Sequence, residues 1–209
     1  MWTAIRPWLF PVWCIGCGVP DTGLCPACCA SARSSTVVLD QLPVRAAGDY
    51  AGAVRDAILA VKRGERACLD PLAALLAPLV PAGTVLVPLT TTRRRAAERG
   101  FDQARELARR VALRAGGTCA DIVRKHGSAQ RGLGRNERLV ARGRFAFRPG
   151  VTIPPRVMLL DDVMTTGATL RDAAALLASA GCSVAGAVVV ARTLPGRETP
   201  RRGGRLVEA

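Results

Sequence analysis

Apolar positions alternate between two periods along most of the chain. Short apolar runs, several of them rich in β-branched residues, predict strands at 37–39, 44–50, 84–87, 157–160 and 184–191. Apolar residues at helical spacing predict helices at 51–63, 69–79, 101–114 and 170–180. The runs at 157–160 and 184–191 are continuously apolar, as expected for strands buried on both faces. Because strands and helices alternate, we predict an α/β fold with a parallel sheet and covering helices.

Composition divides the chain into three parts. Residues 1–35 form a cysteine-rich head that ends in a short linker, and residues 36–194 form the main domain. Residues 195–209 are rich in Arg, Gly and Pro, so we predict a disordered tail. Within the main domain, 124–144 is polar, basic and glycine-bearing, which predicts a long loop or a mobile hairpin.

The most informative stretch is 157–170, VMLLDDVMTTGATL. A predicted buried strand leads into Asp161 and Asp162, a short loop of small and hydroxyl-bearing residues follows, and a helix then begins. This arrangement directs free backbone N–H groups and the positive end of the helix at one place, which suits a phosphate. In open α/β sheets such sites lie beyond the carboxyl ends of the strands. The candidate phosphate-binding residues are Met164, Thr165, Thr166, Gly167, Ala168 and Thr169.

The two adjacent carboxylates need a separate explanation, because they would repel a phosphate. Asp161 and Asp162 could accept hydrogen bonds from the hydroxyl groups of a ribose. They could also help to hold Mg²⁺, which binds carboxylates together with ligand phosphates. The alternative interpretation is an ordinary strand-to-helix turn with an aspartate cap.

The string LLDDVMTTGAT at 159–169 resembles the phosphoribosyl-pyrophosphate signature of type I phosphoribosyltransferases. Both have an apolar run, two acids, a small loop and the pattern Thr-Thr-Gly-x-Thr. The resemblance implies a parallel-sheet type I phosphoribosyltransferase fold for residues 36–194. It also implies that the ligand is phosphoribosyl pyrophosphate or a similar phosphorylated ribose.

Other segments are similar to the ComF family, which is linked to DNA uptake in competent bacteria. They are YAGAVRDAILAVKRGER at 50–66, VPLTTTRRRAAERGFDQA at 87–104, the stretch 124–147 and the cysteine head. The resemblance therefore extends over most of the chain, up to about Thr193. It implies the DNA-uptake machinery or single-stranded DNA as candidate partners.

By position, this resemblance implies roles for further residues. The pyrophosphate loop would consist of Pro88, Leu89, Thr90 and Arg93. A mobile hood over the site would include Arg124, Lys125, Gln130 and Arg138. The chain departs from the family in two places. Asp102 stands where the family usually has Asn, and a second Asn, which in the family follows the arginine of the hood, is not evident near Ala141. The first departure places an extra negative charge near the implied pyrophosphate site.

The implied reaction displaces pyrophosphate at the anomeric carbon of the ribose, through an oxocarbenium-like transition state. Such a reaction needs positioning, Mg²⁺ and cations that stabilise the departing pyrophosphate, and it needs no strong nucleophile on the protein. The candidate catalytic residues are Asp161, Asp162 and Arg99. The alternative function is a binding module without turnover, which senses the ligand or contacts single-stranded DNA.

The head contains two paired cysteine motifs, seven residues apart. Four thiolates at such spacing can surround one Zn²⁺ tetrahedrally, and a small head would gain stability from the metal. Disulfides and an iron–sulfur cluster are the alternatives, and a cytoplasmic chain disfavours disulfides. The candidate ligands are Cys14, Cys17, Cys25 and Cys28, with Cys29 as a fifth cysteine beside them.

Charge and composition extend this interpretation. The formal net charge is +14, and Lys62 and Lys125 are the only lysines, so arginine carries nearly all of the positive charge. Arginine suits phosphorylated ligands and nucleic acid alike, although solvated arginines are an equally simple explanation.

The aromatic residues Trp2, Trp8, Phe10 and Trp13 would either be buried or stack on bases. Proline and glycine interrupt the longest apolar stretches, so we predict no membrane span, no signal peptide and a cytoplasmic protein.

Overall fold

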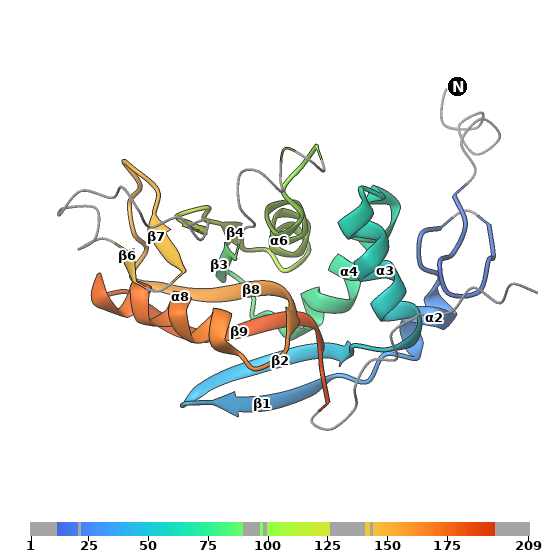
Figure 1. Cartoon of the computed structure of the whole chain (residues 1–209), viewed down its shortest axis with the longest axis horizontal. Helices are drawn as coiled ribbons and strands as arrows, with labels where there is room; N and C mark the ends of the chain where they lie inside the picture. Colours follow the sequence, from blue (N-terminus) through green and yellow to red (C-terminus); the bar gives the residue numbers. More distant parts are fainter. Residues whose placement is uncertain are drawn as a thin grey trace, which may run out of the picture.

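A computed structural model describes residues 12–20, 22–89, 97, 100–125, 141–142 and 144–194. Its centre is a six-stranded sheet with the order β1-β2-β9-β8-β3-β4 (Figure 1). The strands are β1 (Ser35–Leu39), β2 (Leu42–Asp49), β3 (Val85–Pro88), β4 (Thr118–Cys119), β8 (Arg156–Met164) and β9 (Ser183–Arg192). All neighbouring pairs are parallel except β1 and β2, which form an antiparallel hairpin at one edge. The predicted α/β fold with a parallel sheet is thus confirmed.

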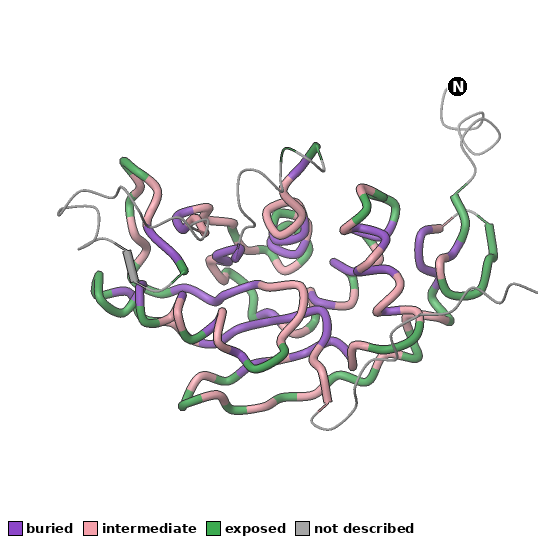
Figure 2. Tube along the Cα trace, in the orientation of Figure 1, coloured by how far each residue is buried: buried purple, intermediate pink, exposed green. Residues whose placement is uncertain are grey.

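Helices cover both faces of this sheet. The four longer helices are α3 (Gly52–Arg63), α4 (Leu69–Leu76), α6 (Gln103–Arg114) and α8 (Ala168–Ser179). Side chains alternate across each strand, so Met158 and Leu160 of β8 share one core with α3, α4 and α6. Val157 and Leu159 face the other core, together with α8. Figure 2 shows the resulting band of buried residues along the central strands.

Several predicted boundaries change in the structure. The predicted helix at 69–79 ends at Leu76, and a 3-10 turn, η2 (Ala77–Leu79), follows. Pro78 lies in that turn and has no N–H to donate, so it cannot continue the α-helical ladder. The strand predicted to end at 160 continues to Met164, because its pairing with β9 extends as far as Arg192. The two carboxylates of the signature therefore lie within a strand, and the loop begins at Thr165.

The predicted long loop at 124–144 contains strands at its two ends. β5 (Val123–Lys125), β6 (Ala141–Arg142) and β7 (Phe145–Phe147) form a small antiparallel sheet. Phe145 is fully buried against the core that contains α8, which fixes this sheet to the main domain. Residues 126–140 and 143, and the predicted tail at 195–209, lie outside the described part of the chain.

The cysteine-rich head packs against α3 and the chain that precedes α4 (Figure 1). It contains the short helix α2 (Pro26–Ala30), and Leu24 is buried in the same core as α3 and α4. Gly23 lies so close to the backbone that a Cβ there would be 2.4 Å from the carbonyl carbon of Ala67. The thiol of Cys68 donates to the Gly23 carbonyl at 3.3 Å, so Cys68 joins the head to the main domain.

Length and hydropathy also bear on the predicted lack of a membrane span. Among the residues that the structure describes, no helix combines the length and the apolar character needed to cross a bilayer.

Candidate functional site

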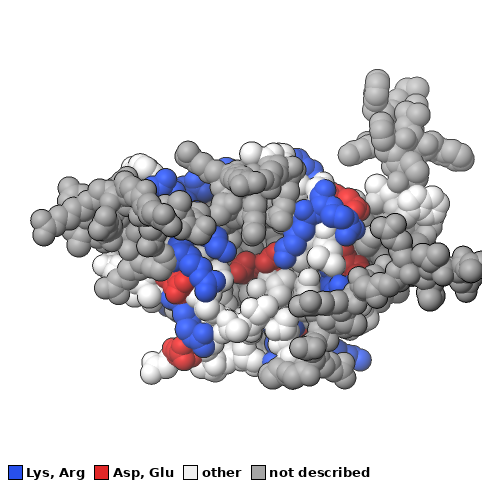
Figure 3. Space-filling view, in the orientation of Figure 1, with Lys and Arg blue, Asp and Glu red and all other residues white. Residues whose placement is uncertain are grey.

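A cavity of about 470 Å³ lies at the carboxyl ends of β3 and β8, beside α3, α4 and α6. Apolar and polar groups contribute about equally to its lining, and the apolar side chains include Leu69, Leu72 and Leu107 from the helices and Leu89 from the segment after β3. The polar side chains around it are Lys62, Gln103, Lys125, Asp161, Asp162 and Thr169. Figure 3 shows acidic atoms at the centre of this face of the molecule, with basic side chains on both sides.

Asp161 and Asp162 reach the cavity from the last part of β8. The Nζ atom of Lys62, near the end of α3, lies 2.7 Å from Oδ2 of Asp162. Oδ1 of Asp161 accepts the backbone N–H of Asp162 at 2.9 Å, and Oδ1 of Asp162 accepts that of Val163 at 2.7 Å. These bonds orient both carboxylates while leaving further oxygen lone pairs for a ligand.

The protonation of Asp161 follows from its surroundings. Burial disfavours the charged carboxylate, and the negative charge of Asp162 adds to this effect, so the pKa of Asp161 is raised to about 8. Lys125 attracts the carboxylate and partly offsets the shift. A bound cation, or hydroxyl donors from a sugar, would stabilise the ionised pair in the same place.

The loop after β8 leads into the N-terminus of α8. Gly167 adopts φ 76°, a left-handed conformation that glycine tolerates, and α8 begins at Ala168. Thr165 and Thr166 are exposed, whereas Thr169 faces the cavity beside the carboxylates. The N-cap residue Gly167 has no side chain to bond the first turn of α8, although the Ala168 N–H donates to Oγ1 of Thr166 at 3.4 Å. A helix N-terminus of this kind can present its remaining N–H groups to an anion.

The structure brings together only part of the predicted site. Asp161, Asp162, Thr169, Leu89 and Lys125 all line the cavity. The other described candidates flank it: Pro88 ends β3, Met164 ends β8, and Arg124 lies in β5 next to Lys125. Five further candidates lie outside the described residues: Thr90, Arg93, Arg99, Gln130 and Arg138.

Asp102, the residue that departs from the ComF pattern, caps α6. Its carboxylate accepts the backbone N–H of Arg105 at 3.1 Å, as aspartate commonly does at an N-cap. Burial raises the pKa of Asp102, although the Arg105 N–H and nearby arginines oppose the shift. Asp102 thus performs a structural task that the sequence comparison alone did not indicate.

Two ion pairs near the site, Arg144 with Asp172 and Arg171 with Asp40, were not predicted from the sequence. Arg144, in the turn before β7, lies 3.3 Å from a carboxylate oxygen of Asp172 and 3.4 Å from Oγ1 of Thr169. Arg171 of α8 pairs with Asp40 of the β1–β2 turn. No local motif marks these contacts, since Asp40 and Arg171 are 131 positions apart in the sequence.

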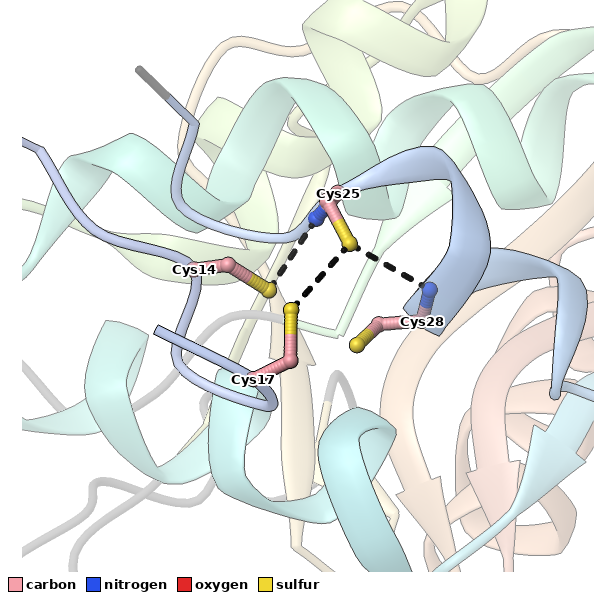
Figure 4. A group of neighbouring side chains, drawn as sticks. All are labelled: Cys14, Cys17, Cys25 and Cys28. Carbon is pink, nitrogen blue, oxygen red and sulfur yellow. Dashed lines mark hydrogen bonds between the residues drawn. The ribbon is translucent and has the colours of Figure 1, made fainter. Parts of the chain in front are cut away.

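The four predicted metal ligands converge in the head (Figure 4). Their Sγ atoms all lie within 4.8 Å of one another, and those of Cys17 and Cys25 are 3.6 Å apart. Two sulfurs on a tetrahedral Zn²⁺ with Zn–S bonds of about 2.3 Å would be about 3.8 Å apart, so the spacing fits zinc. No other described group of His, Cys, Asp or Glu comes together in this way.

The hydrogen bonds of the cysteine cluster also suit a metal. Backbone N–H groups of Cys25 and Cys28 donate to the sulfurs of Cys14 and Cys25, at 3.3 and 3.4 Å. Burial opposes ionisation of Cys14, but backbone donors outweigh it and lower the pKa of this thiol to about 6. For Cys28, burial and the neighbouring cysteines raise the pKa to about 12. Four thiols in contact cannot all ionise without a cation between them, and a divalent metal would resolve this conflict.

The remaining cysteines have other surroundings. Cys29 is not part of the cluster; its thiol lies 3.9 Å from the Leu24 carbonyl. All described cysteines are free thiols. The cluster is therefore a four-cysteine site, and it is compatible with structural zinc.

Comparison with known proteins agrees with the fold and the signature. The profile of the phosphoribosyl transferase domain matches residues 48–204. The chain is also 38% identical over 98 residues to "Competence protein ComFC" of Streptococcus pneumoniae (strain ATCC BAA-255 / R6), which supports the resemblance to the ComF family. That match covers 46% of this chain and 42% of the relative, so the chain spans less than half of that protein's length. Because the domain profile covers well over half of the sequence, this chain belongs to the phosphoribosyl transferase domain family.

Proposed function

We propose that the chain binds phosphoribosyl pyrophosphate, together with Mg²⁺, in the cavity beside β8. The observation that carries this proposal is that the two adjacent carboxylates and Thr169 line one cavity, at the point where a parallel strand leads to the N-terminus of α8. A ligand with both a diol and a phosphate matches that combination, because each kind of group has its own partners.

Each part of the ligand has candidate partners. The ribose hydroxyls would donate to Asp161 and Asp162, and the 5-phosphate would accept from the loop at Thr165, Thr166, Gly167, Ala168 and Thr169. The pyrophosphate would lie toward Pro88 and Leu89 at the end of β3. Carboxylates and phosphate oxygens are the ligands that Mg²⁺ prefers, so the metal would neutralise the acid pair when the ligand binds.

A transferase reaction would follow from this binding mode. The chain's residues would hold the anomeric carbon in place and stabilise charge on the leaving pyrophosphate, without forming a covalent bond. Lys125 and Lys62 are the cations that the cavity supplies within the described residues, and Arg99 is a further candidate from the sequence. The acceptor is a separate question, which an activity screen addresses.

Calorimetry with phosphoribosyl pyrophosphate and Mg²⁺ tests the binding proposal. Wild type should bind, and the double substitution Asp161→Asn/Asp162→Asn should abolish binding while preserving side-chain shape. Asp56→Asn is the matched control, because Asp56 lies on α3 and pairs with Arg55. The proposal is wrong if wild type gives no heat of binding, or if the double variant binds as well as the control.

A second assay separates a transferase from a ligand sensor. Pyrophosphate release would be followed with nucleobases and with ammonia as acceptors. Release that depends on one acceptor and disappears in the Asp161→Asn/Asp162→Asn variant supports transfer. Binding without release across the whole panel supports the sensing module.

A second candidate function is contact with single-stranded DNA. The net charge of +14 favours it, as does the similarity to a protein named for competence. Trp13 is 57% exposed on the head, where a base could stack on its ring. A mobility shift that weakens as salt increases, and weakens further with Trp13→Ala, would support this function. Identical shifts for wild type and Trp13→Ala would exclude the aromatic contact.

We also propose that Zn²⁺ is the metal of the four-cysteine site and has a structural role. Metal analysis of the purified protein should give one zinc per chain, and Cys14→Ser/Cys17→Ser should give none. One iron per chain in place of zinc, or no bound metal, would contradict this assignment.

A further inference from the structure

The tip of the β1–β2 hairpin lies against the loop that follows β8. Asp40 and Gln41 form the turn with positive φ values of 48° and 71°. The side chain of Leu39 packs onto Gly167 so closely that a Cβ at Gly167 would be 2.3 Å from Leu39 Cδ2. The tip of the β1–β2 hairpin therefore packs directly against the loop that follows β8.

Arg171 connects the hairpin and the loop. Its Nε atom bonds to the carboxylate of Asp40, and its NH1 atom donates to the backbone carbonyl of Thr166 at 2.9 Å. One planar guanidinium thus contacts the turn and the loop at the same time. Lysine carries its three N–H donors on one nitrogen, so it could not bridge the two groups with the geometry of the planar guanidinium.

The contact with the Thr166 carbonyl fixes the direction of the next amide. A trans peptide unit is planar, and its C=O and N–H bonds point in opposite directions. When Arg171 holds the Thr166 carbonyl, the N–H of Gly167 must point away from Arg171. Gly167 is the N-cap of α8, so this N–H belongs to the group of donors available to an anion.

We propose that Arg171, held by Asp40, is a positioning residue that aims the Gly167 amide at the 5-phosphate of the ligand. This inference rests on the proposed function, because it assigns a role within the same phosphate loop. It also makes the β1–β2 hairpin part of the site, although most of the hairpin precedes the segment that matches the domain profile.

A purely structural role would give a different pattern. The Arg171 and Asp40 side chains are 43% and 70% exposed, and exposed ion pairs add little to folding stability. Substitution of Arg171 should therefore leave the melting temperature nearly unchanged. It should selectively weaken ligands that carry the phosphate, by about fivefold to tenfold, the effect of one misaligned hydrogen bond.

Calorimetry with two probes tests this proposal: ribose 5-phosphate, and pyrophosphate with Mg²⁺. The variants are Arg171→Ala, Arg171→Lys and Asp40→Asn, each with its melting temperature. Arg109→Ala is the matched control. The Arg109 side chain is 61% exposed on α6, and its NH1 atom lies as far as 4.0 Å from the nearest carboxylate oxygen of Glu106, so its ion pair is weak. We expect Arg171→Ala to lose affinity for ribose 5-phosphate but to keep its affinity for pyrophosphate with Mg²⁺. Asp40→Asn and Arg171→Lys should show intermediate losses of affinity for ribose 5-phosphate. In ¹H–¹⁵N spectra, the ligand-induced shift of the Gly167 amide should shrink in Arg171→Ala.

The outcomes distinguish the two proposals. If wild type binds neither probe, the proposed function fails and this inference fails with it. If wild type binds both and Arg171→Ala binds ribose 5-phosphate equally well, only this inference is overturned. Equal weakening toward both probes, or a large fall in melting temperature, would also overturn it.

Discussion

Replacing Asp161 by asparagine should stabilise the folded protein while removing a group that the proposed ligand needs. The substitution keeps the shape of the side chain and removes the group that ionises. In the folded protein the pKa of Asp161 is raised from 3.8 to about 8, first by burial and then by the charge of Asp162. The folded state therefore retains a proton that the unfolded chain releases.

The sign of the pH effect follows from this difference. Between about pH 4 and pH 8 the folded state binds more protons at Asp161, so wild-type stability falls as pH rises through this window. At pH 8 the shift corresponds to an upper limit of about 5 kcal/mol, at about 1.4 kcal/mol per pH unit. Because the cavity admits water and Lys125 lies near the carboxylate, we expect a gain of about 1–3 kcal/mol for Asp161→Asn at pH 8.

Chemical denaturation at pH 5 and pH 8 measures this effect. The difference in unfolding free energy between Asp161→Asn and wild type should be larger at pH 8 than at pH 5. Asp172→Asn is the control, because it removes an ion pair with Arg144 instead of relieving a buried charge. A difference that is independent of pH, or a variant that is less stable than wild type at pH 8, would refute the reasoning.

Three other substitutions or treatments have expected outcomes. Gly167→Ala should destabilise the protein by about 1–3 kcal/mol, measured by denaturation, because φ is 76° and the new methyl group would overlap Leu39; unchanged stability would contradict this packing. Chelation of zinc, or the substitution Cys17→Ser, should lower the free energy of unfolding by about 2–5 kcal/mol, measured by thermal denaturation. Added Zn²⁺ should restore the stability of the chelated wild type but not that of Cys17→Ser. Unchanged stability in the presence of chelator would argue against a structural metal. Arg144→Ala should weaken ribose 5-phosphate binding by roughly threefold to tenfold in calorimetry, because Arg144 contacts the Thr169 hydroxyl. Unchanged affinity would show that Arg144 has no role in binding beyond its ion pair with Asp172.

Local patterns predicted much of the fold. The helix over α3 ends at Arg63, as the pattern indicated, because Gly64 adopts φ 107° and closes it. Continuous apolar runs predicted β8 and β9, the central pair of the sheet. Spacing alone predicted the four cysteines that converge, since paired cysteine motifs constrain their own geometry.

The differences at the candidate site have a common physical origin in long-range pairing. Asp161 and Asp162 were predicted to follow a strand, but β9 supplies partners that extend β8 past them. The ion pair between Lys62 and Asp162 depends on how α3 packs on the sheet, which no local pattern specifies. The same is true of Arg171 and Asp40, which meet only because the hairpin folds across the loop. Sequence signatures thus identified several residues that line the cavity, but not the ion pairs that hold them in place.

The position of α3 has a consequence for how the two ends of the molecule communicate. Its first turn packs against the head, where a Cβ on Gly16 would be 2.7 Å from Ala53, and its last turn carries Lys62 to the acid pair. The helix has 12 residues, a rigid rod of about 18 Å. If the four-cysteine site holds zinc, as proposed, removal of the metal would loosen the head around the first turn of α3. Lys62, at the other end of the helix, would then be held less firmly against Asp162. Bound zinc would in that case help to organise the cavity at the far end of α3.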